Sequence, residues 1–591
     1  MIATSSHESK NSATHVTPYI FALILAATVP YVNALTNGFI WLDRPEILEG
    51  RLLIDSLSEL IHAAWYNDNN YSGYHRPIYN AIHSFDYLIW KENPIGYHLS
   101  SVVLHMLNVI LIYYLLSKLT SRTHISFYVA LFWGLHPVNT AAVSLIHSKA
   151  DLLVTFFSLG SFIVSFLYVQ HNRKTMAAWC LPILAGILYL LALLSKETAL
   201  ICPLVLVIIL LSREKKSDVC PAAGNSYALL LVVFGVVTIA YILHRLLVIS
   251  FDTPENKMPL LDRMLTFIPV YLAYMTKSLS TIELTTNDAV LIWRYYGMIF
   301  PIMLLVLLIV LAAQILVAIK NPKCLPGILW FNLYLLPVAQ VFPILHFRAD
   351  RFLYIPSIGL IWATVVFVED MAARFRNKNF GGVIFRSLQL LVLVIAGYFF
   401  IRIWERNKDF KHDDVFFEEL TAKHPECREA HSFLALEYLS REEFERAAVA
   451  FQKALSKDER FYSYVNYDDV EGNYAVLLLR KGKYQEAYGI LNALLARVSE
   501  ANPEVYFNIG VCCLKIGKYG EAYGHFRRYL EVMPNNADAL FLLGKSSIAL
   551  GRLQDAQNAF KQYLKVVPSA GDREYVEQFL RSLKEVDAAS P

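Results

Sequence analysis

The chain is organised around Asn37-Gly38-Phe39-Ile40-Trp41-Leu42-Asp43-Arg44-Pro45-Glu46-Ile47, which stands where its first apolar run ends. Asp43, Arg44, Pro45 and Glu46 bring a carboxylate, a guanidinium and a rigid turn to a predicted membrane boundary. Residues of this kind could hold a phosphate-linked substrate and remove a proton. The alternative is a capping box, with Asp43 and Glu46 at the start of a short helix. These residues alone leave both interpretations open.

The composition is that of a membrane protein. Of 591 residues, 56% are apolar and 17% are charged, the mean hydropathy is +0.40, and soluble domains carry about 25% charged residues. Long apolar runs continue to about residue 405, and charged helical sequence follows, so we expect two domains. The seven cysteines show neither a disulfide framework nor zinc-ligand spacing. The net charge of +3 says little about partners.

Apolar runs of about twenty residues predict the membrane spans. We predict about eleven of them, at approximately 17–35, 97–117, 125–145, 151–170, 176–195, 197–212, 226–250, 297–319, 325–345, 352–369 and 384–404. The segment 197–212 is short for a span, and 263–280 could be re-entrant or interfacial. The first run has no obvious cleavage site and is interpreted as a retained anchor behind a disordered cytoplasmic lead, residues 1–16.

The basic residues orient these spans, because short cytoplasmic loops collect Lys and Arg. A cytoplasmic N-terminus puts the basic clusters near residues 118–122, 173–174, 213–216, 320–323 and 374–378 inside. It also puts a long first loop, 36–96, outside, where spaced apolar residues from 52 to 62 predict an amphipathic surface helix that could form a lid or floor.

Five polar clusters then lie on the same outer face. They are the Asp43 loop, Tyr74-His75-Arg76-Pro77, His147-Ser148-Lys149-Ala150-Asp151, Ser195-Lys196-Glu197-Thr198 and His346-Phe347-Arg348-Ala349-Asp350-Arg351. Ionisable residues at the depth of a bilayer indicate function, and five segments converging on one face predict a shared site. Boundary snorkelling with helix capping is the alternative for each cluster.

The second span carries His98 and His105 on one helix face, together with Asn108. No carboxylate or cysteine joins them at metal-ligand spacing, so no metal site is predicted. Hydrogen bonding between helices explains this polar stripe, and a supporting place for His98 in the site is the second interpretation.

The C-terminal part repeats with a period of 34 residues. Gly510, Gly517, Ala522, Phe526, Tyr529 and Pro534 recur as Gly544, Gly551, Ala556, Phe560, Tyr563 and Pro568, a pattern typical of tetratricopeptide (TPR) repeats. We predict a charged linker helix at 405–425, then roughly four helical hairpins in a TPR domain at 426–587. Its concave face would suit an extended peptide or a partner protein, whereas packing on the membrane domain or oligomerisation is the alternative.

Several blocks resemble the transmembrane and TPR O-mannosyltransferase (TMTC) family and its prokaryotic relatives. They include Trp41-Leu42-Asp43-Arg44-Pro45-Glu46-Ile47-Leu48, His75-Arg76-Pro77, Asn93-Pro94-Ile95-Gly96-Tyr97-His98-Leu99, Leu104-His105-Met106-Leu107-Asn108, Leu135-His136-Pro137-Val138-Asn139-Thr140, Ser148-Lys149-Ala150-Asp151-Leu152-Leu153, Leu194-Ser195-Lys196-Glu197-Thr198 and Asp350-Arg351-Phe352-Leu353-Tyr354-Ile355-Pro356. The match runs in order through most of the membrane domain.

The resemblance implies an all-α protein, with a polytopic GT-C-type transmembrane domain at 17–404 followed by the TPR α-solenoid. It implies an inverting transfer of a hexose, mannose by analogy, from a polyprenyl-phosphate donor to Ser or Thr hydroxyls of a protein, with Asp43 as the catalytic base. Arg351, Arg348, Lys196, Arg76 and Lys149 are the candidates for the donor phosphate, with Arg351 favoured. Arg44, Glu46, Glu197, Asp151 and His98 are expected to support the site.

This sequence departs from the family at three places. Leu42 precedes Asp43 where relatives often pair two acids, Ala141 replaces a frequent glutamate, and Lys149 replaces a frequent arginine. The first difference weakens any carboxylate pair, so no cofactor is expected, although a divalent metal is not excluded. A lysine offers a point charge in place of a bidentate fork.

Two further functions stay open, namely a glycosyltransferase acting on a lipid-linked glycan and a non-catalytic membrane scaffold that recruits partners. Nucleic-acid binding has no support, because no basic patch with interleaved aromatic residues is present. The predicted topology puts the TPR domain in the periplasm, or in the lumen if the protein is eukaryotic. Compact loops favour a bacterial inner membrane.

Overall fold

The chain folds into helices throughout its described parts. The computed structural model describes residues 5–48, 53–65, 75–170, 176–212, 223–248, 258–286, 288–375, 381–497, 502–567 and 571–589. Two compact units divide the chain: Met1–Cys427 with Asp458–Tyr464, and Arg428–Lys457 with Val465–Pro591. The predicted all-α architecture, an apolar helical part followed by helical repeats, is confirmed.

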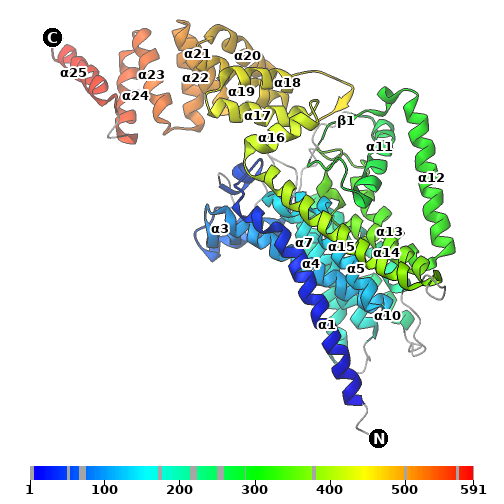
Figure 1. The fold of residues 1–591 in the computed structure, drawn as a ribbon. Coiled ribbons are helices and arrows are strands. Elements are labelled where there is room, and N and C mark those ends of the chain that lie inside the picture. Colours follow the sequence, from blue (N-terminus) through cyan, green and yellow to red (C-terminus); the bar gives the residue numbers. More distant parts are fainter. Residues whose placement is uncertain are drawn as a thin grey trace. The chain divides into compact units, whose positions relative to one another are not determined.

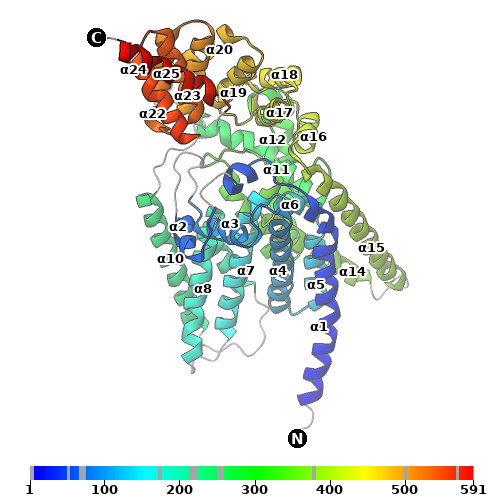
Figure 2. The same ribbon diagram turned by 90° about the vertical axis from the view of Figure 1, so that its left-hand side faces the viewer.

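The first unit carries the apolar helices together with more polar ones (Figure 1). These are α1 (Ser5–Thr28), α2 (Leu60–Trp65), α3 (Pro77–Trp90), α4 (Pro94–Thr120), α5 (Thr123–Gly134), α6 (Thr140–Ser144), α7 (Lys149–Gln170), α8 (Met176–Ser195), α9 (Cys202–Leu211), α10 (Ala223–Val248), α11 (Leu260–Leu279), α12 (Ile299–Lys320), α13 (Leu325–Leu335), α14 (Pro356–Phe375), α15 (Gly381–Arg406) and α16 (Asp413–Lys423). Figure 2 shows α4, α7 and α8 side by side, and α7 packs on both neighbours. One antiparallel pair, β1 (Val290–Leu291) with β2 (Phe461–Tyr462), places Val290 opposite Tyr462.

Seven helices of the described residues are long and apolar enough to cross a membrane. They are Thr17–Thr36, Pro94–Thr120, Ile146–Gln170, Tyr227–Leu247, Ile299–Lys320, Pro356–Arg374 and Phe385–Phe410. Cys180–Ser195 and Glu197–Leu211 are apolar but shorter. The chain is therefore a helical membrane protein, although its predicted spans are not all continuous helices.

Two predicted spans are broken. Across 125–145, α5 ends at Gly134, and a 3-10 turn at Pro137–Asn139 separates it from α6. Across 325–345, α13 ends at Leu335, ahead of the 3-10 turn Leu336–Val338. Both breaks contain a proline, which lacks the amide hydrogen and restricts the preceding residue. Apolar composition alone did not reveal that the helices end inside these two apolar runs.

Two further expectations differ from the structure. Residues 5–16 are helical, as the first part of α1, where the sequence predicted disorder. The expected amphipathic surface helix is reduced to a 3-10 turn (Leu57–Glu59) and the short α2, and Leu52 lies outside the described residues.

The segment 263–280 forms α11 but does not qualify as a span. Tyr74, Pro568, Cys220 and the basic residues 173–174, 213–216, 376 and 378 also lie outside the described residues.

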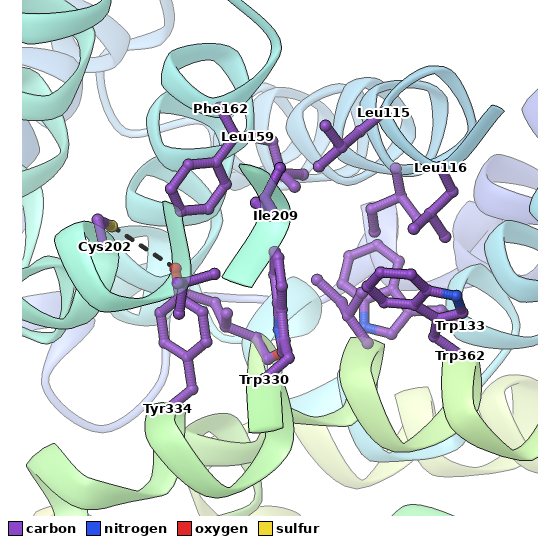
Figure 3. Packing of buried hydrophobic residues seen from close by; sticks show 14 of the residues in the cluster. Leu115, Leu116, Trp133, Leu159, Phe162, Cys202, Ile209, Trp330, Tyr334 and Trp362 are labelled. Atoms are coloured by element: carbon purple, nitrogen blue, oxygen red, sulfur yellow. Dashed lines mark hydrogen bonds between the residues drawn. The ribbon is translucent and has the colours of Figure 1, made fainter. Parts of the chain in front are cut away.

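A core of large side chains positions the start of α14. Trp133 of α5 donates to the carbonyl of Tyr354 at 2.9 Å, and Trp330 of α13 donates to that of Ile355 at 3.0 Å. Figure 3 shows both indole rings among leucine and phenylalanine side chains, with Cys202 bonded to the Tyr334 hydroxyl at 3.5 Å. Because both indoles bind carbonyls, the segment just after His346–Arg351 is held firmly in place.

The second unit is a stack of helical hairpins in chain order (Figure 1). Its helices are α17 (Arg428–Ser440), α18 (Phe444–Ala454), α19 (Tyr467–Arg480), α20 (Tyr484–Arg497), α21 (Pro503–Lys515), α22 (Tyr519–Val532), α23 (Ala537–Ala549), α24 (Leu553–Val566) and α25 (Arg573–Ala589). Gly482, Gly517 and Gly551 have positive φ in the turns. Gly510 and Gly544 face Phe526 and Phe560, which explains why glycine repeats there. The four predicted hairpins are present, with α25 after them.

Candidate active site

Asp43 is fully buried and is held by three donors. Its Oδ1 accepts the backbone N–H of His147 at 2.9 Å and lies 3.1 Å from Nδ1 of the same residue, while Oδ2 accepts the N–H of Ile40 at 3.1 Å. All three partners precede Asp43 or lie far from it, so the bonds given by the described residues are not those of a helix cap. The carboxylate instead ties the first loop to the turn that begins α7.

Trp41 covers this contact and is strained. It is a non-glycine residue with φ of 54°, in the left-handed region. Its ring meets the His147 ring edge-on, with centroids 4.8 Å apart, and the Arg351 guanidinium lies 5.6 Å from its centroid. The backbone N–H of Trp41 donates to Oδ1 of Asp413 at 2.6 Å. Strained residues of this kind persist where surrounding contacts fix them, often in functional sites.

Arg351 and Lys196 share one aromatic ring. The Arg351 guanidinium lies 5.4 Å and the Lys196 ammonium 5.3 Å from the centroid of Phe352. Lys196 also donates to Asp151 at 2.6 Å, and Arg351 approaches His346 Nδ1 at 3.2 Å. Three of the five predicted clusters therefore meet at Phe352 and Asp151, which the sequence places far apart.

Glu197 joins the remaining cluster. Arg76 donates to its Oε2 at 2.9 Å and Arg245 to its Oε1 at 3.0 Å, and all three side chains are about one-fifth exposed. Arg76, Arg245, Lys196 and Arg351 therefore bring four cationic side chains together with the carboxylates of Glu197 and Asp151. Cationic side chains of this kind suit a phosphate.

Lys149 and Arg348 have carboxylate partners in this structure. Lys149 is fully buried and forms an ion pair with Asp86 of α3, and Ser100 accepts a bond from it at 2.7 Å. Arg348 makes a bidentate pair with Asp288 at 2.5 and 2.8 Å. Burial opposes ionisation of Asp288, but the Arg348 and Lys277 charges outweigh it and hold the pKa of Asp288 below its usual value. A donor contact from either cation stays a prediction.

The supporting residues are dispersed. Asp151 and Glu197 bind the cations above, whereas His98 of α4 is buried and interacts electrostatically with Asp43 and Lys149. Arg44 is 62% exposed in its side chain and lies 3.7 Å from Asp413. Glu46 falls in the turn Arg44–Leu48, and its side chain is outside the described residues. The structure thus brings Asp151 and Glu197 to the cations, places His98 near Asp43 and Lys149, and leaves Arg44 at the surface.

Sequence reasoning missed four partners of the charged residues: Asp86, Asp288, Arg245 and Asp413. Asp86 could have been found, because Tyr79, His83 and Asp86 follow helical spacing on the buried face of α3, where a carboxylate requires a partner. Asp288 and Asp413 lie in loops or at a helix start, and nothing in their spacing indicates a contact across the fold. Within the described residues, no three acids, histidines or cysteines are grouped to hold a metal ion.

Two family models match the C-terminal helical part of the chain. A family model described as anaphase-promoting complex, cyclosome, subunit 3 matches residues 480–563, and one described as tetratricopeptide repeat matches residues 416–460. The oligosaccharyltransferase of Archaeoglobus fulgidus is similar in structure with a TM-score of 0.39 and 12% identity, over 76% of this chain and 62% of that one.

Two of the curated relatives are both named as protein O-mannosyl-transferases. A protein O-mannosyl-transferase of Caenorhabditis elegans is 24% identical over 409 residues, which cover 64% of this chain and 54% of the relative. The protein O-mannosyl-transferase Tmtc1 of Drosophila melanogaster is 31% identical over 242 residues, 39% of this chain and 26% of the relative. The chain therefore spans about half the length of the first relative and about a quarter of the length of the second. The resemblance to the TMTC family is confirmed.

Proposed function

We propose that this chain is a GT-C-type membrane glycosyltransferase that transfers a hexose from a polyprenyl-phosphate donor to Ser or Thr hydroxyls of a protein, with inversion. The observation that carries the proposal is the buried Asp43, bonded to His147 and linked through Trp41 to Arg351. Burying a carboxylate is costly to a fold even when it is hydrogen-bonded, and the cost is understandable if the group serves chemistry. The relatives named protein O-mannosyl-transferase support mannose as the first sugar to test.

Asp43 is suited to the role of base. An ionised carboxylate has about four lone-pair positions, and the described residues supply three donors to it. One position therefore stays for an acceptor hydroxyl. As the hydroxyl oxygen attacks the anomeric carbon, its proton passes to Asp43 and the bond from that carbon to the phosphate oxygen breaks.

Arg351, Lys196, Arg76 and Arg245 are suited to the leaving group. The phosphodiester of the donor carries one negative charge, and the released polyprenyl phosphate approaches two as its bond breaks. Fixed cations bind the second state more tightly than the first, which lowers the barrier. Arg351 and Lys196, whose charged groups both lie near the Phe352 ring, are the central pair in this proposal.

The second unit is proposed to hold the acceptor polypeptide or a partner protein, because TPR helix stacks form extended binding faces. We place this unit on the non-cytoplasmic side, because the basic loops favour the opposite side as cytoplasmic. For the whole protein we propose the bacterial inner membrane. No cofactor is assigned.

The test is transfer of radiolabelled mannose from polyprenyl-phosphate mannose in membranes that carry equal amounts of each variant. Asp43→Asn should lower protein labelling by about 10²–10⁴-fold, and Arg351→Ala should also lower it. The matched controls are Asp262→Asn, whose buried carboxylate pairs with Arg294, and Arg122→Ala, whose guanidinium pairs with Glu369. Both should keep activity.

Counting protein and lipid fractions separately identifies the acceptor. Label in lipid alone would replace the protein acceptor with a lipid-linked glycan. Equal labelling by wild type and Asp43→Asn would remove the catalytic role from Asp43. Failure of the wild type to transfer from any of a broad set of polyprenyl donors would leave the scaffold function.

A further inference from the structure

A group of buried polar atoms beside Asp43 has no hydrogen-bond partner among the described residues. The group consists of both ring nitrogens of His83, both of His98, Nε2 of His147 and Oγ of Ser148. His83, His98 and Ser148 are at most 3% exposed. The backbone of Asn37 and Gly38 lies near His98 but does not reach hydrogen-bond geometry. Buried polar groups nearly always have a partner, so this group needs an explanation.

The four residues come from separate elements that meet around one ion pair. His83 belongs to α3, three residues before Asp86, and His98 belongs to α4. His147 and Ser148 precede Lys149, the partner of Asp86, at the start of α7. His83 interacts electrostatically with Lys149 and His147, and His98 does so with Asp43 and Lys149. The residues that carry the unpartnered atoms are thus linked to Lys149 or Asp43, His83 and His98 by electrostatic interaction, His147 by its bonds to Asp43, and Ser148 by its place next to Lys149.

The chemistry of these atoms matches neutral hydroxyls. Burial and the nearby Lys149 hold the pKa of His83 well below its ordinary value, so its ring is neutral and offers one donor and one acceptor. A sugar hydroxyl likewise donates one bond and accepts others. Asp86 already neutralises Lys149, while Asp43 would repel a sugar carboxylate.

We infer that His83, His98, His147 and Ser148 form the subsite for the hexose of the donor, selecting a neutral polyhydroxylated ring. The inference rests on the proposed function, because it uses Asp43 as the base that faces the acceptor. The subsite would hold the hexose through its hydroxyls, while the cations near Phe352 hold the phosphate.

The test compares two lipids on the full-length protein in nanodiscs: a short polyprenyl-phosphate mannose and the same polyprenyl phosphate without sugar. Wild type should bind the mannose lipid at least about ten-fold more tightly, since a site built for hydroxyls is left unpaired without them. His83→Leu and His98→Leu should each remove most of that difference and leave the affinity for the sugar-free lipid unchanged. Their thermal midpoints should not fall, because each removes an unpartnered buried polar group.

His136→Leu is the matched control. This histidine is also buried with an unpartnered Nε2, but its ring packs on Phe399, so the preference for the mannose lipid should persist. If a leucine variant does not fold, the corresponding glutamine variant is measured, and it should keep an intermediate preference.

Three results would overturn the inference while leaving the donor class intact. These are equal affinity of wild type for the two lipids, full preference in both histidine variants, or an equal loss in His136→Leu. Binding of neither lipid by wild type would instead remove the proposed donor class, and the hexose subsite with it.

Discussion

Asp43 is bound twice by His147, through the backbone N–H at 2.9 Å and through the ring Nδ1 at 3.1 Å, both to the same oxygen. The two residues are 104 positions apart, so this contact fixes the first loop against the start of α7. The position of the proposed base therefore depends on the imidazole of His147. The sequence pattern placed this residue only within the cluster 147–151 and predicted no contact with Asp43.

The first prediction concerns His147→Ala. The backbone bond survives this change, but the ring bond to Asp43 is lost, and the carboxylate can turn away from its position. A misplacement of about 1 Å lowers catalysis by about 10²-fold, so kcat/KM for transfer should fall by roughly that factor. The measurement is the steady-state rate with polyprenyl-phosphate mannose and excess acceptor.

A double variant shows whether His147 acts through Asp43. At saturating donor, where a lost contact to the hexose does not limit the rate, Asp43→Asn/His147→Ala should be no slower than Asp43→Asn alone, because residues that act as a unit are not additive. Additive losses would give His147 an independent role. His124→Gln, which removes a half-exposed imidazole near Glu369, serves as the control and should keep the wild-type rate.

The second prediction concerns stability. Lys149 and Asp86 form a buried ion pair, whereas Lys91 and Asp55 form an exposed one, with side chains 48% and 92% exposed. Lys149→Met leaves Asp86 buried without its cation and should cost about 3–5 kcal/mol. Lys91→Met should change stability by at most about 1 kcal/mol. Urea unfolding in detergent measures both.

A double variant at this ion pair tests whether the unpaired charge of Asp86 causes the loss of stability. Lys149→Met/Asp86→Leu removes both charges and should recover most of the stability lost in Lys149→Met. Similar losses in Lys149→Met and Lys91→Met would mean that Asp86 finds another partner or water.

Much of the fold could be read from the sequence because its signals are local. The 34-residue period fixed the hairpins, since Gly510 must sit against Phe526 and Gly517 must take positive φ. Apolar length identified most spans. It failed at 125–145 and 325–345, where Pro137 and Pro337 end helices inside apolar sequence.

The candidate site was only partly readable for a different reason. The five clusters could be placed on one face from topology, and their residues do meet in a connected set of contacts. Which carboxylate pairs with which cation depends on tertiary packing. Asp86 and Asp288 therefore bind Lys149 and Arg348, which the sequence had assigned to the donor phosphate.

The third prediction is a pH dependence at Asp288. A carboxyl group whose pKa is lower in the folded state than in the unfolded chain stabilises the fold above its unfolded pKa, about 3.9. That contribution is lost as the pH falls through the folded-state value. Arg348→Gln removes the main charge that lowers the pKa of Asp288, and burial then raises it. Arg348→Gln should therefore be less stable than wild type near pH 7, and part of this loss should be recovered as the pH falls and the buried carboxyl group takes up a proton.

Unfolding free energies between pH 3 and pH 7 check this expectation. Asp288→Asn/Arg348→Gln has no carboxyl group to titrate there and should not show this recovery on acidification. Equal pH profiles for Arg348→Gln and wild type would show that Lys277 or His424, both near Asp288, keeps the carboxylate ionised.

The fourth prediction separates two glycines of the second unit. A Cβ at Gly510 of α21 would lie 2.7 Å from Cε1 of the buried Phe526, whereas a Cβ at Gly489 of α20 would meet nothing within 4 Å. Gly510→Ala must therefore displace an aromatic ring between α21 and α22 and should cost about 1–3 kcal/mol. Gly489→Ala relieves only the backbone entropy of glycine in a helix and should gain about 0.5–1 kcal/mol. Hydrogen exchange of α21 and α22 amides in the full chain should speed up in the first variant and not in the second. Unchanged exchange in Gly510→Ala would mean that Phe526 can move without loss, and that the repeating glycine serves something other than helix packing.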